Sequence, residues 1–110
     1  MLDTPKQYCE SINLPEALSI RTVSELYSKF ADAFQGRDTI VIGIPESAEA
    51  DLSFIQLIES SRRQAKAEGK TFKLSAPVRG SVLKVLDRAG FIDSFDQEDS
   101  KFWLHKEVTL

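Results

Sequence analysis

The sequence predicts an α/β domain with a central mixed sheet of about four or five strands and helices packed against it. A short run rich in β-branched residues, at positions 39–44, is typical of a strand covered on both faces. Helical periodicity precedes and follows this run, so strands and helices alternate along the chain. The length of 110 residues, with 42% hydrophobic and 28% charged residues, is that of one globular domain.

The first half of the chain divides into a strand and a helix. Residues 8–14 are predicted to be extended, because Tyr8, Ile12 and Leu14 then lie on one face. A helix follows from Ser19 or Thr22, where Thr22-Val23-Ser24-Glu25 matches a capping box. Gly36 is expected to end it. Its apolar stripe is predicted to be buried and consists of Val23, Leu26, Tyr27, Phe30 and Phe34.

A second helix follows the loop at residues 45–50. Asp51 is the predicted N-cap, and the helix is expected to run to about Glu68 and stop at Gly69. Phe54 is expected to point inward, whereas Leu52 lies nearer the loop and is expected to be partly exposed. The charged side chains of Arg62, Arg63 and Lys66 are expected to remain in water.

The last third of the chain begins with an alternating segment, residues 71–75, that is predicted to be a strand. Pro77 is expected near the first turn of a third helix, which Gly90 ends. Residues 96–99 are interpreted as a solvated acidic turn. Residues 101–108 are predicted to add a last strand that covers a sheet edge with Phe102 or Trp103.

Charge and cysteine content exclude several classes of function. The chain has 14 basic and 17 acidic residues, a net charge of −3, which argues against sequence-independent nucleic-acid binding. The single cysteine, Cys9, is expected to be a buried thiol in a reducing compartment. No apolar run approaches the length of about 20 residues that spans a bilayer, and no signal peptide is apparent. We expect a cytoplasmic protein without membrane insertion.

The residues give almost no support for catalysis or for a cofactor. His105 is the only histidine, and no His/Cys spacing resembles a metal site. The sequence has no Gly-rich phosphate loop, no Ser/His/Asp set and no convergent pair of carboxylates. We therefore expect a protein that is not an enzyme and has no cofactor or metal.

Several segments between about residues 12 and 95 resemble one known family when they are taken together. They are Leu14-Pro15-Glu16-Ala17-Leu18, Ile40-Val41-Ile42, Asp51-Leu52-Ser53-Phe54-Ile55-Gln56-Leu57, Gly69-Lys70, Ala76-Pro77 and Leu86-Asp87-Arg88-Ala89-Gly90-Phe91. This set is similar to a STAS domain, the family of bacterial anti-sigma-factor antagonists. The resemblance implies a single STAS-like domain over residues 1–110, with residues 101–108 as an extra strand.

The resemblance implies a binding module controlled by phosphorylation. In the family a partner kinase phosphorylates the residue after the Asp, and the added charge of about −2 breaks the contact. Here Leu52 occupies that acceptor position, and Phe54 replaces the glycine that the family typically carries. The usual phospho-switch is therefore not expected. Ser53 is a candidate displaced phosphoacceptor, against the simpler interpretation of a first-turn hydroxyl.

The expected function is that of a non-catalytic protein-interaction regulator in bacterial cytoplasmic signalling, of the anti-anti-sigma type or associated with chemotaxis or two-component systems. Its partner would be an anti-sigma kinase-like, histidine-kinase-like or other signalling protein, and a homodimer stays open. The predicted partner-binding residues are Glu46, Ser47, Asp51, Leu52 and Ser53. Two alternatives remain: an auxiliary STAS subunit that docks on a lipid or solute transporter ATPase, and a sensor of a small anion or nucleotide at the second helix start.

Overall fold

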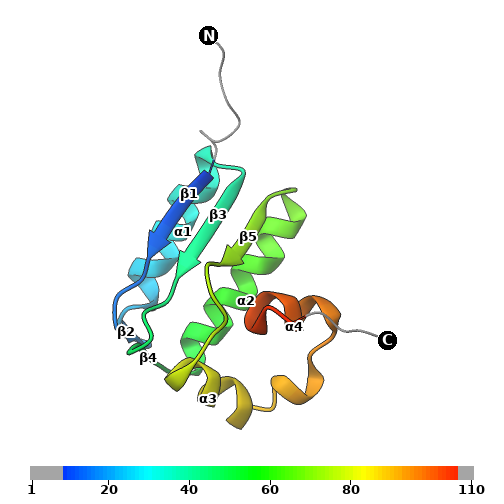
Figure 1. Ribbon diagram of the computed structural model, residues 1–110. Coiled ribbons are helices and arrows are strands. Elements are labelled where there is room, and N and C mark those ends of the chain that lie inside the picture. Colours follow the sequence, from blue (N-terminus) through cyan, green and yellow to red (C-terminus); the bar gives the residue numbers. More distant parts are fainter. Residues whose placement is uncertain (1–8, 107–110) are drawn as a thin grey trace.

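A computed structural model describes residues 9–106 (Figure 1). The elements, in chain order, are β1 (Cys9–Asn13), β2 (Ala17–Leu18), α1 (Val23–Gly36), β3 (Thr39–Gly43), β4 (Glu49–Ala50), α2 (Leu52–Ala67), β5 (Thr71–Leu74), α3 (Gly80–Arg88), a 3₁₀ turn (Ile92–Ser94) and α4 (Gln97–Leu104). Tyr8 of the predicted first strand and residues 107–108 of the predicted last strand lie outside the described residues.

The described strands form two separate sheets. Three of them make a parallel sheet in the order β1-β3-β5, and β2 pairs with β4 in a second, two-stranded parallel sheet. The expected mixed sheet of four or five strands is therefore wrong, although the α/β class is right. Because α1 and α2 each return the chain to the same end of the sheet, the three long strands run in the same direction.

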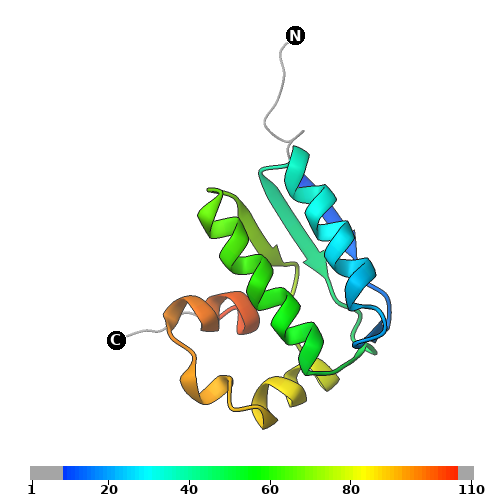
Figure 2. The same ribbon diagram turned by 180° about the vertical axis from the view of Figure 1, so that it is seen from behind.

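The core lies between the three-stranded sheet and the two long helices that cover one of its faces (Figure 2). Ile40 and Ile42 of β3 are fully buried there, in one cluster with Phe30 and Leu86. Phe30 meets Phe72 of β5 edge to face, with ring centroids 5.6 Å apart. The central position predicted for residues 39–44 is confirmed. The prediction that both faces of this strand are covered is wrong, because only alternate residues of β3 are fully buried.

The start of α1 differs from the predicted capping box. Thr22 is at the N-cap, but its side chain does not cap the helix. Its hydroxyl instead donates to the carbonyl of Ala17 at 2.9 Å and accepts from the amide of Ser19 at 3.1 Å, which fixes the turn before the helix. The predicted stripe is buried at Leu26, Phe30 and Phe34, whereas Tyr27 is exposed.

The chain forms a helix where the last strand and the acidic turn were expected. Asp96 accepts the amide of Asp99 at 2.8 Å, and the Asp99 carboxylate accepts the amide of Asp96 at 3.2 Å. These reciprocal bonds satisfy free donors at the start of α4, where negative charge is also favourable. The helix places Trp103 in the core and stacks Phe102 on Phe72, with ring centroids 5.9 Å apart. Phe102 thus covers β5, as expected, but from a helix.

Two smaller expectations are also wrong. Arg62 is held between Glu59 and Asp99, with its Nη1 2.9 Å from an oxygen of each, and its guanidinium lies 4.4 Å from the ring centre of Phe102. Cys9 is exposed rather than buried, because it lies on the uncovered face of the sheet. Helix α3 begins at Gly80, with Arg79 as its N-cap, and Pro77 lies near its first turn, just before the N-cap region.

Candidate interaction surface at the start of the second helix

Asp51 organises the start of α2, as the sequence predicted for an N-cap. Its Oδ1 accepts the backbone N–H of Ser53 at 3.0 Å and that of Phe54 at 3.4 Å. Its Oδ2 accepts the backbone N–H of Ile20 at 3.0 Å, which ties the turn before α1 to the start of α2. One carboxylate therefore caps a helix and holds two distant segments together.

Hydrogen bonding also sets the charge state of Asp51. Its pKa lies below the usual value because the carboxylate accepts a bond from the Ser53 hydroxyl, and further bonds from the amides of Ile20, Phe54 and Ser53. Partial burial acts in the opposite direction but is outweighed by the sum of these bonds. Asp51 is therefore ionised at neutral pH, at a place where the helix dipole also favours negative charge.

Ser53 is half-buried, and its hydroxyl is already engaged. The Oγ donates to Oδ1 of Asp51, the same oxygen that accepts the Ser53 amide. A hydroxyl held against a carboxylate is a first-turn contact that supports the cap.

Leu52 is partly exposed and Phe54 is buried, as expected from their positions at the helix start. The exposed fraction of Leu52 is 44%, and the other large exposed hydrophobic residues among the described ones are Ile20 at 69% and Tyr27 at 61%. Ile20 lies just before α1, and its amide is the one bound by Asp51. Exposed apolar side chains gathered by folding are typical of an interaction surface.

A groove of about 570 Å³ lies between the starts of α1 and α2. Its walls include Ile20, Val23 and Tyr27 on one side and Ser53, Gln56 and Leu57 on the other. The remaining lining residues are serines: Ser24, Ser28 and Ser60. None of these residues is charged, in a chain of which 28% is charged. We call this feature the uncharged groove; Leu52 precedes its lining residue Ser53 in the sequence.

Glu46 and Ser47 contact other residues of the chain outside the uncharged groove. Glu46 Oε2 lies 3.4 Å from Nη1 of Arg79, just before α3, and both side chains are exposed. The Ser47 hydroxyl donates to Glu16 at 2.8 Å, just before β2. Neither residue lines the groove. The structure therefore brings together Asp51, Leu52 and Ser53 of the predicted set and ties the loop residues to other neighbours.

Two groove residues, Ile20 and Tyr27, were not predicted as part of a site. Tyr27 was assigned to the buried stripe of the first helix, but it lies at the edge of that stripe, next to Ser24 and Ser28. The signal in the sequence is this run of small uncharged polar residues beside an aromatic one, where a solvated helix face normally carries charges.

Comparison with protein-family models, with curated proteins and with solved structures found no match for this chain. Within residues 9–106, no group of three or more His, Cys, Asp and Glu side chains is placed to hold a metal ion. No helix in this range is long and apolar enough to span a membrane.

Proposed function

We propose that this chain is a STAS-like regulator that works by binding another protein in bacterial cytoplasmic signalling, without catalysis and without the family's phospho-switch. The observation that carries the proposal is the uncharged groove at the start of α2, lined in part by the exposed side chains of Ile20 and Tyr27. Leu52, also exposed, precedes the groove residue Ser53 in the sequence. In the sequence resemblance, this helix start is the place where a partner binds.

The groove has the composition of the centre of a protein interface. Such centres are depleted in charge and enriched in aromatic residues, and a polar rim excludes water around them. Tyr27 supplies a large apolar body with a polar tip, and Leu52 and Ile20 add apolar area. Serine hydroxyls on both walls provide hydrogen-bonding groups with little side-chain entropy to lose.

The contacts of Asp51 favour a protein partner over a small anion. The backbone N–H groups of Ser53 and Phe54, which an anion would use at a helix start, are already bound to Asp51. The Asp51 carboxylate also places a negative charge at that position. A neutral or apolar segment of a partner needs no free backbone N–H groups there and is not repelled by the Asp51 charge.

Site-specific photo-crosslinking in the native host tests this proposal. A benzophenone amino acid would replace Tyr27 in one variant and the exposed Lys84 of α3 in a matched control. The proposal expects one signalling protein, identified by mass spectrometry, to be captured at Tyr27 and not at Lys84. Capture of a transporter ATPase at Tyr27 would instead support the docking-subunit alternative, and equal capture at both positions would contradict a specific surface here.

A further inference from the structure

β1 is an edge strand whose outer backbone groups have no strand to pair with among the described residues. The sheet order is β1-β3-β5, so β3 pairs with one side of β1 only. The amide of Leu14 donates to the carbonyl of Gly43 at 2.9 Å. Because backbone groups alternate sides along a strand, Cys9, Ser11 and Asn13 direct their N–H and C=O groups away from the sheet. Such a row of donors and acceptors is a template for another strand.

The two edges of this sheet are protected differently. Along β5, Lys73 lies within the strand, and Lys66 and Lys101 line the adjoining groove. Lysines along an edge oppose strand pairing. β1 contains no Lys, Pro or Gly, and its one charged residue, Glu10, is turned toward α1, where it pairs with Arg37 at 3.2 Å. β1, with a single charged residue, is therefore the less protected edge.

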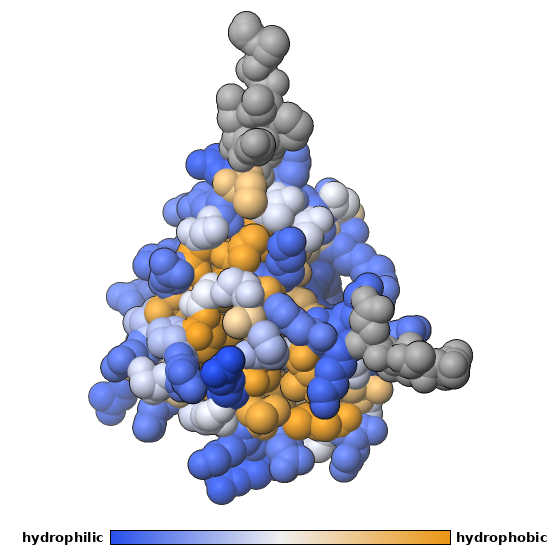
Figure 3. Space-filling model, in the orientation of Figure 1, coloured by the Kyte–Doolittle hydropathy of each residue, from blue (hydrophilic) through white to orange (hydrophobic). Residues whose placement is uncertain are grey.

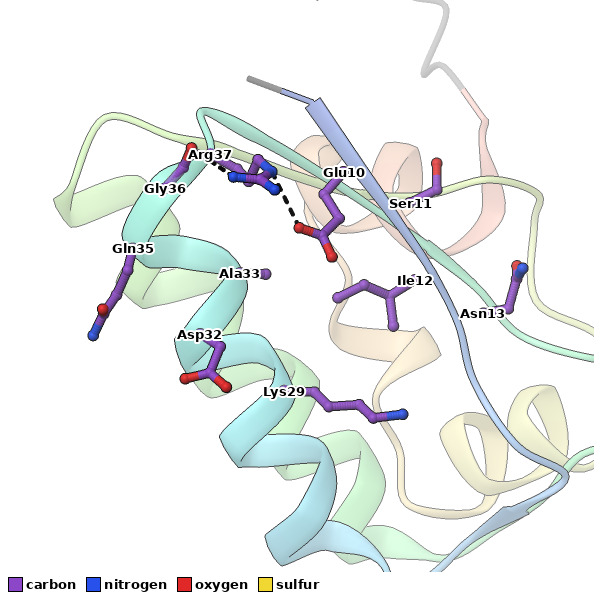
Figure 4. A pocket seen from close by; sticks show the side chains of 10 residues that line it. All are labelled: Glu10, Ser11, Ile12, Asn13, Lys29, Asp32, Ala33, Gln35, Gly36 and Arg37. Atoms are coloured by element: carbon purple, nitrogen blue, oxygen red, sulfur yellow. Dashed lines mark hydrogen bonds and ion pairs between the residues drawn. The ribbon is translucent and has the colours of Figure 1, made fainter. Parts of the chain in front are cut away.

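Space and charge beside β1 also favour pairing. A groove of about 680 Å³ separates its outer edge from α1 (Figure 4). Four charged residues line it, and they balance: Glu10, Asp32, Lys29 and Arg37. On the face of the sheet that α1 and α2 leave open, β1 presents the side chains of Cys9, Ser11 and Asn13, which are small and uncharged. Figure 3 views this open face and shows apolar, weakly polar and hydrophilic side chains mixed over it.

We propose that β1 pairs antiparallel with β1 of a second copy of this chain, around a two-fold axis at Ser11. The two three-stranded sheets would then join into one continuous sheet. In this register Ser11 lies opposite Ser11 of the second copy, Cys9 opposite Asn13, and Glu10 opposite Ile12. The same patch meets itself, as a two-fold interface requires.

Charge complementarity selects a second copy as the occupant and fixes the register. Figure 4 shows Lys29 extending from α1 toward the Ile12 end of the groove, whereas the Glu10–Arg37 pair lies at the other end. The two-fold axis brings the Ile12 end of one copy to the Glu10 end of the other. Lys29 therefore meets Glu10 of the second copy, and the two Glu10 carboxylates do not face each other. The pairing uses none of the residues of the uncharged groove, so it is independent of the proposed function.

The mass of the full chain in solution is the first test. Sedimentation equilibrium should give about twice the 12.3 kDa of one chain, with a dependence on concentration. Ser11→Pro should give a single-chain mass, because it removes an N–H that points away from the sheet and leaves the bonds to β3 intact. The matched control Ser11→Thr keeps the N–H and should remain a dimer. A wild-type chain of 12.3 kDa at every concentration, or a dimeric Ser11→Pro, would overturn the proposal.

Disulfide crosslinking tests the register with variants that do not depend on proline. Asn13→Cys in the chain with native Cys9 should give a nearly complete covalent dimer on mild oxidation. The predicted pair is one in which both hydrogen bonds are exchanged, with Cα atoms about 5.5 Å apart, within the range of a disulfide. Cys9 and position 13 of one strand are about 13 Å apart and cannot join. The wild type and the β5 control Thr71→Cys should give less than a tenth of that yield, and equal yields would overturn the register.

Charge reversal gives an independent check on a helix surface. Lys29→Glu should weaken dimerisation at least tenfold at low ionic strength, because a carboxylate would then face Glu10 of the second copy. The control Lys84→Glu makes the same change on α3 and should leave the dissociation constant within twofold of the wild type. A folded Lys29→Glu variant with an unchanged dissociation constant would overturn the proposed register.

Discussion

The indole nitrogen of Trp103 donates a hydrogen bond to Oε2 of Glu59 at 2.9 Å, and this contact joins α4 to α2 across 44 residues. The same carboxylate oxygen also lies 2.9 Å from Nη1 of Arg62, which in turn reaches Asp99. Trp103 itself is fully buried. The last helix is therefore fastened to the domain by a buried aromatic ring whose polar atom has a partner.

Removal of either side of this contact should lower the free energy of unfolding. Trp103→Ala should cost about 3–5 kcal/mol, since a large core side chain is lost. Glu59→Ala should cost about 1–3 kcal/mol, because the buried indole N–H loses its acceptor. Glu59→Gln keeps an acceptor and should cost less than Glu59→Ala. Urea unfolding followed by circular dichroism measures all three, and a Glu59→Ala variant as stable as the wild type would contradict this account of α4.

Two substitutions in the central strand, β3, compare its covered face with its open face. Ile42→Ala, on the face covered by α1 and α2, should lower the free energy of unfolding by about 2–5 kcal/mol. Val41→Ala, one residue earlier on the open face, should cost clearly less because Val41 is only half-buried. Equal losses in urea unfolding would mean that both faces of β3 are covered in solution.

The lowered pKa of Asp51 predicts a specific dependence of stability on pH. A carboxyl whose pKa falls on folding contributes stability above its unfolded pKa of about 3.9, and this contribution is lost as pH falls through the folded pKa. Asp51→Asn keeps one acceptor at the cap but loses the charge. The difference in free energy of unfolding between wild type and Asp51→Asn should therefore be largest near neutral pH and shrink below about pH 4. A difference that stays constant down to pH 2 would contradict the assigned role of the charge.

Asp96 provides the comparison at the other capped helix. Its pKa is also lowered, first by the bond from the Asp99 amide, with burial opposing and further bonds and the Arg62 charge assisting. Asp96→Asn should therefore lose its effect in the same acid range as Asp51→Asn. The two can be told apart by Ile20, because only Asp51 holds the turn before α1: the Ile20 amide should exchange with solvent faster in Asp51→Asn and not in Asp96→Asn.

The contacts of Ser53 predict that the chain is not phosphorylated at the start of α2. Leu52, at the acceptor position implied by the resemblance, carries no hydroxyl, and the Ser53 hydroxyl is bound to a carboxylate. Incubation with ATP and a serine kinase that phosphorylates STAS-type antagonists should leave the intact mass unchanged. A Leu52→Ser variant serves as the control for kinase activity, and stoichiometric phosphate on Ser53 of the wild type would restore a switch.

The fold was predictable where local pattern and tertiary packing agree. The β-branched residues around Ile40 and the cap at Asp51 give such agreement, and the structure confirms both. α4 (Gln97–Leu104) was not predictable, because its first residues fit an acidic turn and its last ones belong to a segment, residues 101–108, whose weak alternation fits a strand as well as a short helix. The burial of Trp103 beside Glu59 decides between them, and that contact spans 44 residues. Likewise, nothing local in Ala17–Leu18 or Glu49–Ala50 says that they pair with each other rather than extend the main sheet.

The candidate site was predictable in part for the same reason. A cap residue and its exposed neighbour follow from local helix geometry, so Asp51 and Leu52 were identified. Ile20 comes to the same place only through its hydrogen bond to Asp51, 31 residues away. Tyr27 has the same helical spacing as buried residues of α1, and only the position of α2 decides that it is exposed.

The affinity of the partner captured at Tyr27, measured by titration calorimetry, tests the central claim most directly. Leu52→Asp should weaken binding at least tenfold, because it replaces an exposed apolar side chain, next to the groove residue Ser53, with a charge, while circular dichroism shows an intact fold. The fold should persist because a carboxylate at a helix start is favoured by the dipole. Lys84→Asp, which adds the same side chain on α3, should bind like the wild type. Unchanged affinity in a folded Leu52→Asp variant would contradict the account and move the functional surface elsewhere.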